Sequence, residues 1–290
     1  MKPVPFDYQR PQTLDEACRL LTSDGNARIL AGGQSLVPML SMRLSRPSLL
    51  IDIAHIPDLA HIIETEGHIE IGAMVRQASA LNAPLVVQHI PLLAKALRHV
   101  GHPPTRARGT IGGSIAHADP SAEIALVAAT LGAKITYRDA DDEVVFDASA
   151  FFIGPMLTLA PPNGCLVRVS FAKAPGQFGT GFHEVAPRRS DYALASAAAQ
   201  IDADETGTPT AIHLGVGSIG DFPERLDVDQ LLSSGLGDAA ITDTVTGAMA
   251  MLETVEDMHA SAAYRKRVGT ELAIRALRDA RDELQKGIGR

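Results

Sequence analysis

The sequence is poor in cysteine and in aromatic residues, and it has no tryptophan. Cys18 and Cys165 are its two cysteines, so the chain holds neither a disulfide framework nor the four thiolates of an all-cysteine iron–sulfur cluster. Isolated cysteines of this kind are typical of a reducing compartment. Aromatic residues make up only 4% of the chain, which argues against a surface that stacks nucleic-acid bases.

A positive charge excess and long apolar runs are lacking as well. The formal net charge is -8, and no basic stripe offsets it, so we expect no nucleic-acid partner. No apolar run approaches the roughly 20 residues of a membrane span, and the first seven residues lack the apolar core of a signal peptide. These absences predict a cytoplasmic protein without a membrane span.

What the sequence does contain is enough apolar material for sizeable cores. Hydrophobic residues form 46% of the 290 residues, and at about 150 residues per domain the chain suits about two domains. Residues 172–181 are rich in Gly, Pro and Ala and form the predicted domain boundary.

The expected elements before the boundary follow from apolar periodicity, capping residues and helix breakers. They are a helix capped by Thr13, a strand at 28–30, a helix at 36–44, a strand at 49–53, a hairpin at 62–71, helices between 75 and 99 broken at Pro84 and Pro91, a helix at 123–131 ending at Gly132, and strands at 134–138, 143–146 and 166–171.

Beyond the boundary, the pattern predicts an antiparallel sheet followed by two helices. The strands are expected at 182–185, 193–201 and 211–216, and the helices at about 239–252 and 262–284. Residues 193–200 are the weak point of this prediction, because their alanines alone favour helix.

Two glycine-rich stretches carry the clearest chemical signal. They are Ala31-Gly32-Gly33-Gln34-Ser35-Leu36 and Thr110-Ile111-Gly112-Gly113-Ser114-Ile115-Ala116-His117-Ala118-Asp119-Pro120. A pyrophosphate needs several donors at short range, and successive backbone N–H groups supply them where no Cβ blocks the approach. A helix that begins after the loop adds further N–H groups and the positive end of its dipole. We therefore expect both stretches to wrap the phosphates of one nucleotide-type cofactor, and FAD is the favoured candidate.

Glycine-rich sequence also has two other interpretations here. Most Gly-Gly pairs are ordinary turns. A G-x-G-x-x-G string does occur at residues 215–220, but no βαβ unit surrounds it, so a strand end and a turn are expected there.

No complete catalytic or metal-binding set can be assembled from the sequence. His117 and Asp119 have the spacing of two metal ligands, but no third and fourth ligand accompanies them. His99 and His102 are expected at a helix end. His183 and Glu184 could approach the cofactor, but a pair on a strand surface is the favoured interpretation. The G-x-S-x-G motif is absent. We expect neither catalytic residues nor a metal site in this chain.

The glycine-rich stretches resemble those of the FAD-binding medium subunits of molybdenum hydroxylases, the family of carbon monoxide dehydrogenase and xanthine dehydrogenase. Residues 31–38 resemble the first FAD loop of that family, and residues 108–123 resemble the second. Residues 188–193, Arg-Arg-Ser-Asp-Tyr-Ala, resemble a downstream motif whose aromatic side chain lies beside the flavin. Residues 259–265 resemble the start of the last helix, so the similarity spans nearly the whole chain.

The resemblance implies an α+β fold. A bipartite, PCMH-type FAD-binding domain would occupy residues 1–175, with α/β subdomains at about 1–55 and 56–175. An α+β C-terminal domain with a small antiparallel sheet and helices would occupy residues 176–290.

The resemblance also implies the cofactor contacts. Residues 31–36 and 110–114 would hold the phosphates, Glu123 would lie on the adenosine side, and Tyr192 would lie against the isoalloxazine ring at the opposite end. The full implied set is Ala31, Gly32, Gly33, Gln34, Ser35, Leu36, Gly109, Thr110, Ile111, Gly112, Gly113, Ser114, Asp119, Glu123 and Tyr192.

The sequence departs from the family pattern at two places. Residues 104–108, Pro-Thr-Arg-Ala-Arg, stand where the family has a run similar to Gln-Ile-Arg-Asn-Arg, and Ala186-Pro187 precede the paired arginines. Arg106 and Arg108 fit two roles equally well. They could neutralise phosphate, or they could contact a partner.

Three functional hypotheses follow. The leading one is an electron-transfer subunit that passes electrons from the [2Fe-2S] clusters of a small partner subunit through FAD to an external acceptor. Substrate oxidation would then occur on a large molybdopterin subunit, in an assembly expected to be a dimer of heterotrimers. A standalone FAD-dependent oxidase or dehydrogenase is the second hypothesis, and a nucleotide-binding scaffold without a redox role is the third. The substrate and the terminal acceptor are not encoded in this chain.

Overall fold

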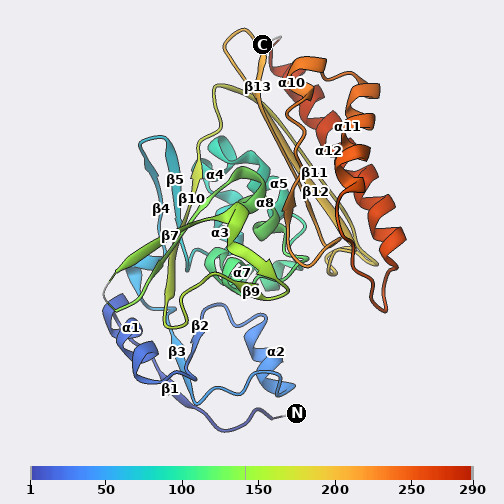
Figure 1. The fold of residues 1–290 in the computed structure, drawn as a ribbon. Helices are drawn as coiled ribbons and strands as arrows, with labels where there is room; N and C mark the ends of the chain where they lie inside the picture. The colour runs from blue at the N-terminus through green and yellow to red at the C-terminus, as the bar shows by residue number, and fades with distance from the viewer. Residues whose placement is uncertain (1, 141, 289–290) are drawn as a thin grey trace.

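Four β-sheets organise the chain in the computed structural model, which describes residues 2–140 and 142–288 (Figure 1). A three-stranded parallel sheet comes first, and a five-stranded antiparallel sheet, a two-stranded ribbon and a four-stranded antiparallel sheet follow. This mixture of helices with small antiparallel sheets is the predicted α+β class.

The N-terminal unit is a three-stranded sheet with strand order β1-β3-β2. Its elements are β1 Asp7–Gln9, α1 Leu14–Ser23, β2 Arg28–Leu30, α2 Leu36–Ser41 and β3 Leu49–Asp52. The predicted helices and strands are confirmed, except that α2 is shorter than expected and β1 was not predicted. Helix α1 begins as the sequence requires, because Thr13 Oγ1 accepts from Glu16 N at 3.2 Å and Gln12 N donates to Glu16 Oε2 at 2.9 Å.

The second unit surrounds the sheet β4-β5-β10-β6-β7. Its elements are a 3-10 turn Pro57–Leu59, β4 Ile62–Thr65, β5 His68–Gly72, α3 Gln77–Asn82, α4 Pro84–His89, α5 Pro91–Leu97, α6 Pro103–Arg108, α7 Ile111–His117, α8 Glu123–Leu131, β6 Lys134–Arg138, β7 Glu143–Asp147, α9 Ala148–Phe151, β8 Phe152–Gly154, β9 Leu157–Thr158 and β10 Cys165–Ala172.

Local chemistry explains most of the helix ends in this unit. Pro84 and Pro91 each begin a new helix, which confirms the predicted interruptions. Gly132 ends α8 with φ +62°, as expected of a glycine C-cap. Helices α6 and α9 and the β8–β9 ribbon were not predicted. The second glycine-rich stretch was expected as a loop, but residues 111–117 of it form helix α7, with Thr110 as the N-cap.

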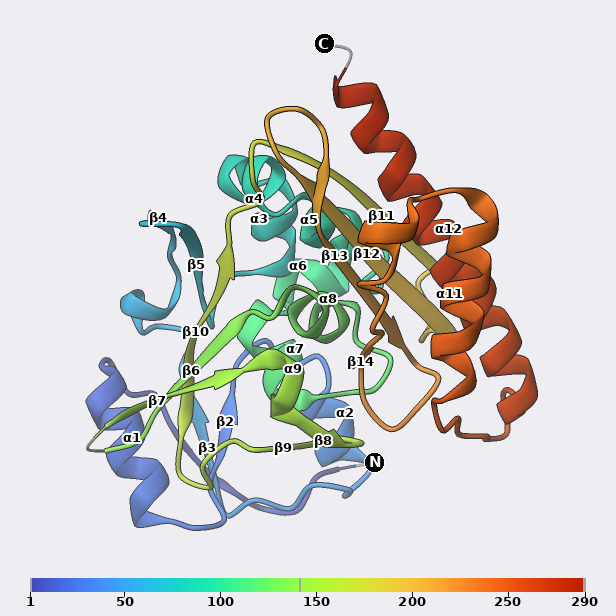
Figure 2. The same cartoon turned by 45° about the horizontal axis from the view of Figure 1, so that its top comes forward.

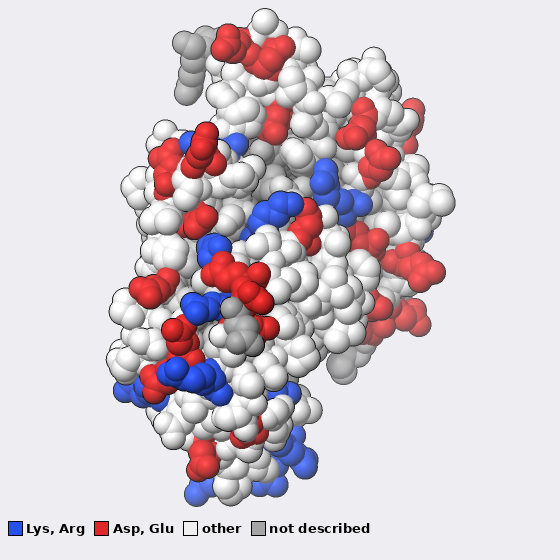
Figure 3. All heavy atoms as spheres, turned by 60° about the vertical axis from the view of Figure 1, so that its left-hand side comes forward, with Lys and Arg blue, Asp and Glu red and all other residues white. Residues whose placement is uncertain are grey.

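Charged side chains cover the outer side of this unit without separating by sign (Figure 3). Lys173 Nζ lies 2.8 Å from Glu64 Oε1, and an Arg168 nitrogen lies 2.7 Å from Glu143 Oε2. Such exposed pairs contribute at most about 1 kcal/mol each. Over the described residues of this side, the two signs of charge interleave.

The C-terminal unit is the sheet β11-β12-β13-β14 with helices packed on both faces. Its elements are β11 Gln177–Val185, β12 Ala195–Ala203, β13 Pro209–Gly217, β14 Glu224–Arg225, α10 Leu231–Ser234, α11 Asp238–Ala250 and α12 Ala262–Ile288. Figure 2 shows α11 and α12 on one side of the sheet and α5 and α8 on the other. The predicted boundary between residues 175 and 176 falls between β10 and β11.

The alanine run of β12 is a strand because both of its faces are covered. Ala197 and Ala199 pack among residues of α12, whereas Ala198 packs against the core of the second unit. Small side chains allow both layers to approach the sheet, so tertiary packing overrides the helix preference of alanine.

Two glycines on β11 let α12 pack against the strand backbone. A Cβ atom on Gly181 would lie 2.9 Å from Ala276 Cα, and one on Gly179 would lie 2.6 Å from Leu284 N. Real Cβ atoms do not approach other atoms this closely, so any larger residue would push the helix away from the sheet.

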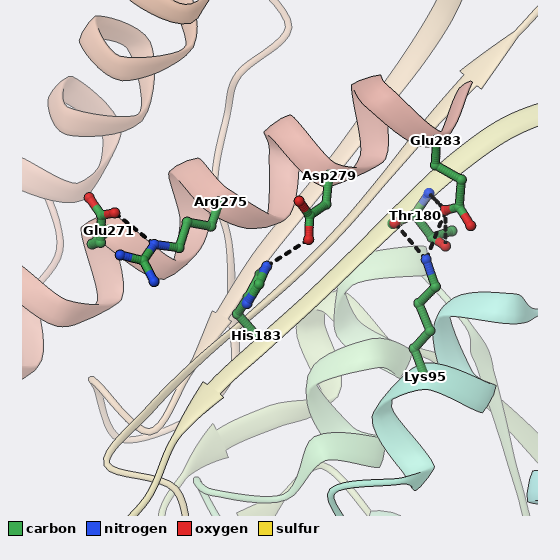
Figure 4. A network of polar contacts seen from close by, with 7 residues as sticks. All are labelled: Lys95, Thr180, His183, Glu271, Arg275, Asp279 and Glu283. Atoms are coloured by element: carbon green, nitrogen blue, oxygen red, sulfur yellow. Dashed lines mark hydrogen bonds and ion pairs between the residues drawn. The ribbon is translucent and has the colours of Figure 1, made fainter. Parts of the chain in front are cut away.

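Polar contacts join α5 to the C-terminal unit beside this packing (Figure 4). Glu283 Oε2 accepts from Lys95 Nζ at 2.8 Å, from Thr180 N at 2.6 Å and from Thr180 Oγ1 at 2.8 Å. His183 Nε2 lies 2.9 Å from Asp279 Oδ2 one turn away. Lys95 therefore connects the helix layer of the second unit to α12.

Every helix within residues 2–140 and 142–288 is too short or too polar to cross a bilayer.

Candidate functional site

The first glycine-rich stretch is an open loop between β2 and α2. Gly33 has φ +72°, a backbone conformation that favours glycine. The loop turns tightly, because Val37 N donates to Gly33 O at 3.1 Å and Gln34 Nε2 donates to Gly32 O at 3.3 Å. Ser35 holds the N-cap position of α2 without capping a backbone N–H.

The backbone N–H groups of this loop are free. Among the described residues, none of the N–H groups from Gly32 to Leu36 donates to a protein acceptor. Consecutive unpaired N–H groups form a concave donor array that suits an anion. This part of the structure has the geometry that the sequence predicts for a phosphate cradle.

The second glycine-rich stretch is arranged differently. Ile111 N donates to Val75 O and Gly112 N to Ala73 O, each at 3.0 Å, and Gly113 N donates to Thr110 Oγ1 at 3.0 Å. These N–H groups already have acceptors, so phosphate contacts from residues 110–114 stay a prediction. The visible role of Gly112 is packing, because a Cβ atom there would lie 2.6 Å from Ala73 Cα.

The two stretches touch each other although about 80 residues separate them in sequence. A Cβ atom on Gly32 would lie 2.9 Å from Gly109 Cα and would also collide with the Arg108 carbonyl group. On the other side of the contact, a Cβ atom on Gly113 would lie 3.7 Å from Ala31 Cβ. The predicted pairing of the two stretches at one place in the fold is therefore what the structure shows.

A cleft of about 410 Å³ opens beside this contact. Arg76 and Arg108 line it together with the first glycine-rich loop. Arg76 Nη1 donates to the Arg108 carbonyl oxygen, and Gln77 N donates to Gly109 O at 2.9 Å, so residues 76 and 77 hold the second stretch in place. Burial, together with the neighbouring Arg108 guanidinium, lowers the pKa of Arg76.

One carboxylate, Asp52, also lines this cleft, and it already has partners. Asp52 accepts from the Tyr8 hydroxyl and, at 2.9 Å, from Ala54 N, and it lies 4.0 Å from Arg10 Nε. The hydrogen bond to Asp52 raises the pKa of Tyr8. The two arginines thus leave positive charge in a cleft that also presents free N–H groups, a combination that favours a dense anion.

Sequence reasoning missed Arg76 and left Arg108 undecided between two roles. Arg76 belongs to no motif, and an isolated bridge to Thr110 brings it to the cleft. Arg106 points elsewhere, because its Nη1 donates to Val100 O at 2.8 Å and to Gly101 O at 2.7 Å. The structure thus separates the two arginines by role, with Arg108 at the cleft and Arg106 tied to backbone carbonyls.

The predicted residues Asp119, Glu123 and Tyr192 form a second group, beyond the C-terminal end of α7. Helix α7 has seven residues, or a length of about 10 Å at about 1.5 Å per residue. Tyr192 lies on the β11–β12 loop and is 69% exposed. Ser121 Oγ donates to Ala193 O at 3.2 Å and ties that loop to the segment after α7.

Electrostatic interactions link these three side chains. Partial desolvation of the hydroxyl end, followed by the nearby carboxyl groups of Asp119 and Glu123, raises the pKa of Tyr192. Burial and the nearby Glu184 raise the pKa of Glu123 to about 8. The positions that the resemblance implies for Glu123, on the adenosine side, and for Tyr192, against the isoalloxazine ring, stay a prediction.

Glu184 joins this group from β11, although a surface position was predicted for it. Its side chain is only 5% exposed, because α5 and α8 cover this face of the sheet. That prediction was wrong for Glu184. His183, the other member of the predicted pair, is paired with Asp279.

The other candidates from the sequence fit structural roles. The string at residues 215–220 begins on β13. A Cβ atom on Gly215 would lie 3.2 Å from the Cβ atom of Thr130, so this glycine allows β13 to pack closely on α8. In residues 2–140 and 142–288, no three potential ligands among His, Cys, Asp and Glu gather as a metal site would require. Cys18 and Cys165 are both buried thiols.

Comparison with known proteins identifies the class of both halves. Residues 4–172 match the family described as FAD binding domain in molybdopterin dehydrogenase. Residues 181–280 match the CO dehydrogenase flavoprotein C-terminal domain.

Individual relatives match over nearly the whole chain. The chain is 37% identical over 287 residues to the alpha subunit of the 6-hydroxypseudooxynicotine dehydrogenase complex of Paenarthrobacter nicotinovorans, covering 97% of this chain and 96% of the relative. It is 34% identical to the nicotine 6-hydroxylase medium subunit of the same organism, covering 97% and 99%. Among solved structures, a chain of carbon monoxide dehydrogenase from Hydrogenophaga pseudoflava superposes with a TM-score of 0.94 at 29% identity, covering 98% and 100%.

The chain belongs to the family of FAD-binding medium subunits of molybdenum hydroxylases and is a subunit of an oxidoreductase. Its own geometry fits the cofactor of that family. The cleft with the free N–H groups and arginines suits a pyrophosphate, and the group around Tyr192 offers an exposed aromatic ring about one short helix away. An elongated dinucleotide can reach both places.

Proposed function

We propose that this chain is the electron-transfer subunit of a molybdenum-containing hydroxylase or dehydrogenase. FAD supplies the redox chemistry when bound, because it can accept electrons from one-electron [2Fe-2S] clusters of a small partner subunit and pass them to an external acceptor. The molybdopterin centre that oxidises the substrate would lie on a large partner subunit. We further propose a cytoplasmic dimer of heterotrimers, and an FAD-binding domain that ends near residue 175.

The observation that carries this proposal is the cleft beside Gly32. It combines the free N–H groups of the first loop with the residues Arg76 and Arg108. These residues would bind and orient the pyrophosphate, while Tyr192 would cover one face of the isoalloxazine ring. The contacts implied for the first loop are supported more directly than those implied for residues 109–114.

The residues of this chain have a binding role in the proposal and no role as acid or base toward the organic substrate. Relatives of nearly equal length are named for 6-hydroxypseudooxynicotine, nicotine and carbon monoxide. Chains of one architecture thus accompany very different substrates, which supports a substrate pocket on another subunit.

Co-purification of the natively expressed protein tests the proposal. We expect two partner chains, iron, molybdenum and FAD, with a flavin released on denaturation and a visible spectrum that contains iron–sulfur absorption. A colourless chain that stays colourless after incubation with FAD would contradict the proposal. Oxidation of an organic substrate by the isolated, FAD-loaded chain would instead indicate a standalone flavin enzyme.

A further inference from the structure

Arg265 is a buried arginine near the beginning of the last helix. It is 4% exposed and is the fourth residue of α12. The helix dipole disfavours a cation near the N-terminus of a helix, and a buried guanidinium needs hydrogen-bond partners to offset its lost hydration. The stability of α12 alone therefore does not explain this residue, and its partners show what it holds together.

The guanidinium of Arg265 joins three separate segments of the chain. Its Nη1 atom donates to Leu194 O at 2.8 Å and to Ser218 O at 2.6 Å. Its Nη2 atom donates to Asp257 Oδ2 at 2.7 Å. Two backbone N–H groups and Arg265 lower the pKa of Asp257 to about 2, so this carboxylate is ionised at neutral pH and the ion pair stays charged.

The contact with Leu194 reaches the loop that carries Tyr192. This loop connects β11 to β12, and Leu194 N donates to Val185 O at 2.8 Å across its base. Tyr192 precedes Leu194 by two residues. Arg265 therefore holds the end of the loop from which the exposed tyrosine ring projects.

The contact with Ser218 reaches the segment after α7. While the Ser218 carbonyl accepts from Arg265, the Ser218 N–H donates to Pro120 O at 3.0 Å. Ser218 is buried and has φ +65°, a conformation that residues other than glycine seldom adopt. Contacts on both sides of its peptide unit thus fix this turn between α12 and Pro120.

The segment after α7 returns to the Tyr192 loop and closes a ring of hydrogen bonds. Ser121 Oγ donates to Ala193 O at 3.2 Å, and Ser121 N donates to Asp119 Oδ1 at 2.8 Å. Starting from Arg265, the ring passes through the turn at residue 218, residues 120–121 and residues 193–194. It therefore fixes the backbone on both sides of the group that contains Asp119 and Tyr192.

We propose that Arg265 is a positioning residue for the flavin end of the cofactor site. It acts through the backbone of the ring and sets where the Tyr192 side chain stands relative to Asp119. The inference rests on the proposed function, since the position of the tyrosine ring matters to the cofactor only if FAD lies against it. A lysine would keep the charge but lacks the planar fork that holds two carbonyls and a carboxylate together.

Fluorine NMR of the FAD-free, full-length chain labelled with fluorotyrosine tests the positioning directly. The chain has only four tyrosines, and the variant Tyr192→Phe assigns the signal of Tyr192. We expect Arg265→Lys to shift or broaden that signal.

Arg281→Lys is the matched control and should leave the Tyr192 signal unchanged. Arg281 lies on the same helix and has the same kinds of partner, because its Nη1 atom donates to Leu236 O at 3.0 Å and to Asp238 Oδ1 at 2.6 Å. These partners belong to the segment around α10 and α11 and not to the ring.

A double-mutant cycle with Tyr192→Ala tests the link to the cofactor. Arg265→Lys should weaken FAD binding at least about threefold in the wild-type background and clearly less in the Tyr192→Ala background, because residues of one network have non-additive effects. It should also alter the absorption of bound flavin in the direction of Tyr192→Ala. Arg281→Lys should have the same effect in both backgrounds.

Each outcome of these measurements has a definite meaning. An unmoved Tyr192 signal in Arg265→Lys, or additive effects of Arg265→Lys and Tyr192→Ala on FAD affinity, would overturn the inference and leave the proposed function intact. A wild-type chain that fails to bind FAD would contradict both.

Ser121→Ala keeps the inference testable if Arg265→Lys does not fold. This variant opens the same ring at Ala193 without disturbing a buried charge. It should move the Tyr192 signal and show the same non-additivity with Tyr192→Ala. An unmoved signal in Ser121→Ala would show that the ring does not position the tyrosine, and the inference would fall.

Discussion

Gly32 lies so close to Gly109 that a Cβ atom on Gly32 would approach the Gly109 Cα to 2.9 Å. This contact joins the two glycine-rich stretches and forms one wall of the cleft that holds Arg76 and Arg108. The absence of a side chain at position 32 therefore matters for packing as well as for access of an anion.

The first prediction concerns this contact. Gly32→Ala should separate the two stretches, destabilise the chain by about 1–3 kcal/mol through overpacking and weaken FAD binding at least tenfold. Chemical denaturation and FAD titration measure the two effects. Gly25→Ala is the control, because a Cβ atom there meets nothing within 4 Å. Wild-type FAD affinity in Gly32→Ala would show that the contact is unrelated to the cofactor site.

Arg76 and Arg108 give the second prediction. Charged hydrogen bonds contribute about 1.5–3 kcal/mol, so Arg76→Gln and Arg108→Gln should each weaken FAD binding by about 10- to 100-fold. They should also reduce the salt dependence of the affinity, because one cationic partner of the phosphates is lost. Arg46→Gln is the control, since Arg46 is exposed and donates to the Arg43 carbonyl outside the cleft. Unchanged affinity in both cleft variants would move the phosphate site elsewhere.

Local sequence chemistry predicted the parts of the fold that depend on neighbouring residues. Thr13 caps α1, Pro84 and Pro91 begin helices, and Gly132 ends α8, as their conformational preferences require. Strand β1 was missed because Asp7–Gln9 is short and exposed and is ordered by pairing with β3.

Residues whose role depends on tertiary contacts could not be assigned from sequence. Arg76 reaches the cleft only through its bridge to Thr110, and no local pattern marks it. Glu184 reads as a surface residue on an alternating strand until α5 and α8 cover its face. The paired glycine stretches were recognisable because their composition is unusual, but the hydrogen bonds that occupy Ile111 N and Gly112 N depend on Val75 and Ala73.

The third prediction concerns Tyr192. Because its side chain is 69% exposed, Tyr192→Ala should change the free energy of unfolding by less than about 0.5 kcal/mol. The same variant should alter the absorption and fluorescence of bound FAD, since the isoalloxazine ring would lose its aromatic cover. Tyr264→Ala is the comparison, because the Tyr264 ring lies on α12 beside the guanidinium of Arg267. An unchanged flavin spectrum in Tyr192→Ala would contradict the assigned contact.

The contact between Lys95 and Glu283 gives the fourth prediction. Burial alone would raise the pKa of Glu283, but the hydrogen bonds from Lys95 and Thr180 outweigh burial and lower it. A lowered pKa in the folded state means that the stabilisation is present above the unfolded value of about 4.3 and is lost as the pH falls below it. Because Glu283 is 46% exposed, Glu283→Gln should cost only about 1 kcal/mol.

Urea denaturation at pH 7 and at pH 4 measures this contribution. The difference between wild type and Glu283→Gln should shrink at the lower pH, whereas Glu271→Gln should differ little from wild type at either pH. An equal loss of stability at both pH values would show that the charge of Glu283 is unimportant and that only its packing matters.

The fifth prediction is a fall in the stability of the FAD-free chain between about pH 4.5 and pH 8. Burial raises the pKa of Glu184 to about 7, and burial with the nearby Glu184 raises that of Glu123 to about 8. Both groups therefore bind more protons in the folded state than in the unfolded state, where the pKa is about 4.3. Stability then decreases as the pH rises through this window and levels off above the folded values.

Free energies of unfolding by urea, measured from pH 5 to pH 9, check this sign. The decline should be smaller for Glu184→Gln and smallest for the double variant E123Q/E184Q, because the amide side chain does not titrate. Parallel stability profiles for wild type and the double variant would show that neither carboxyl group is protonated in the folded chain.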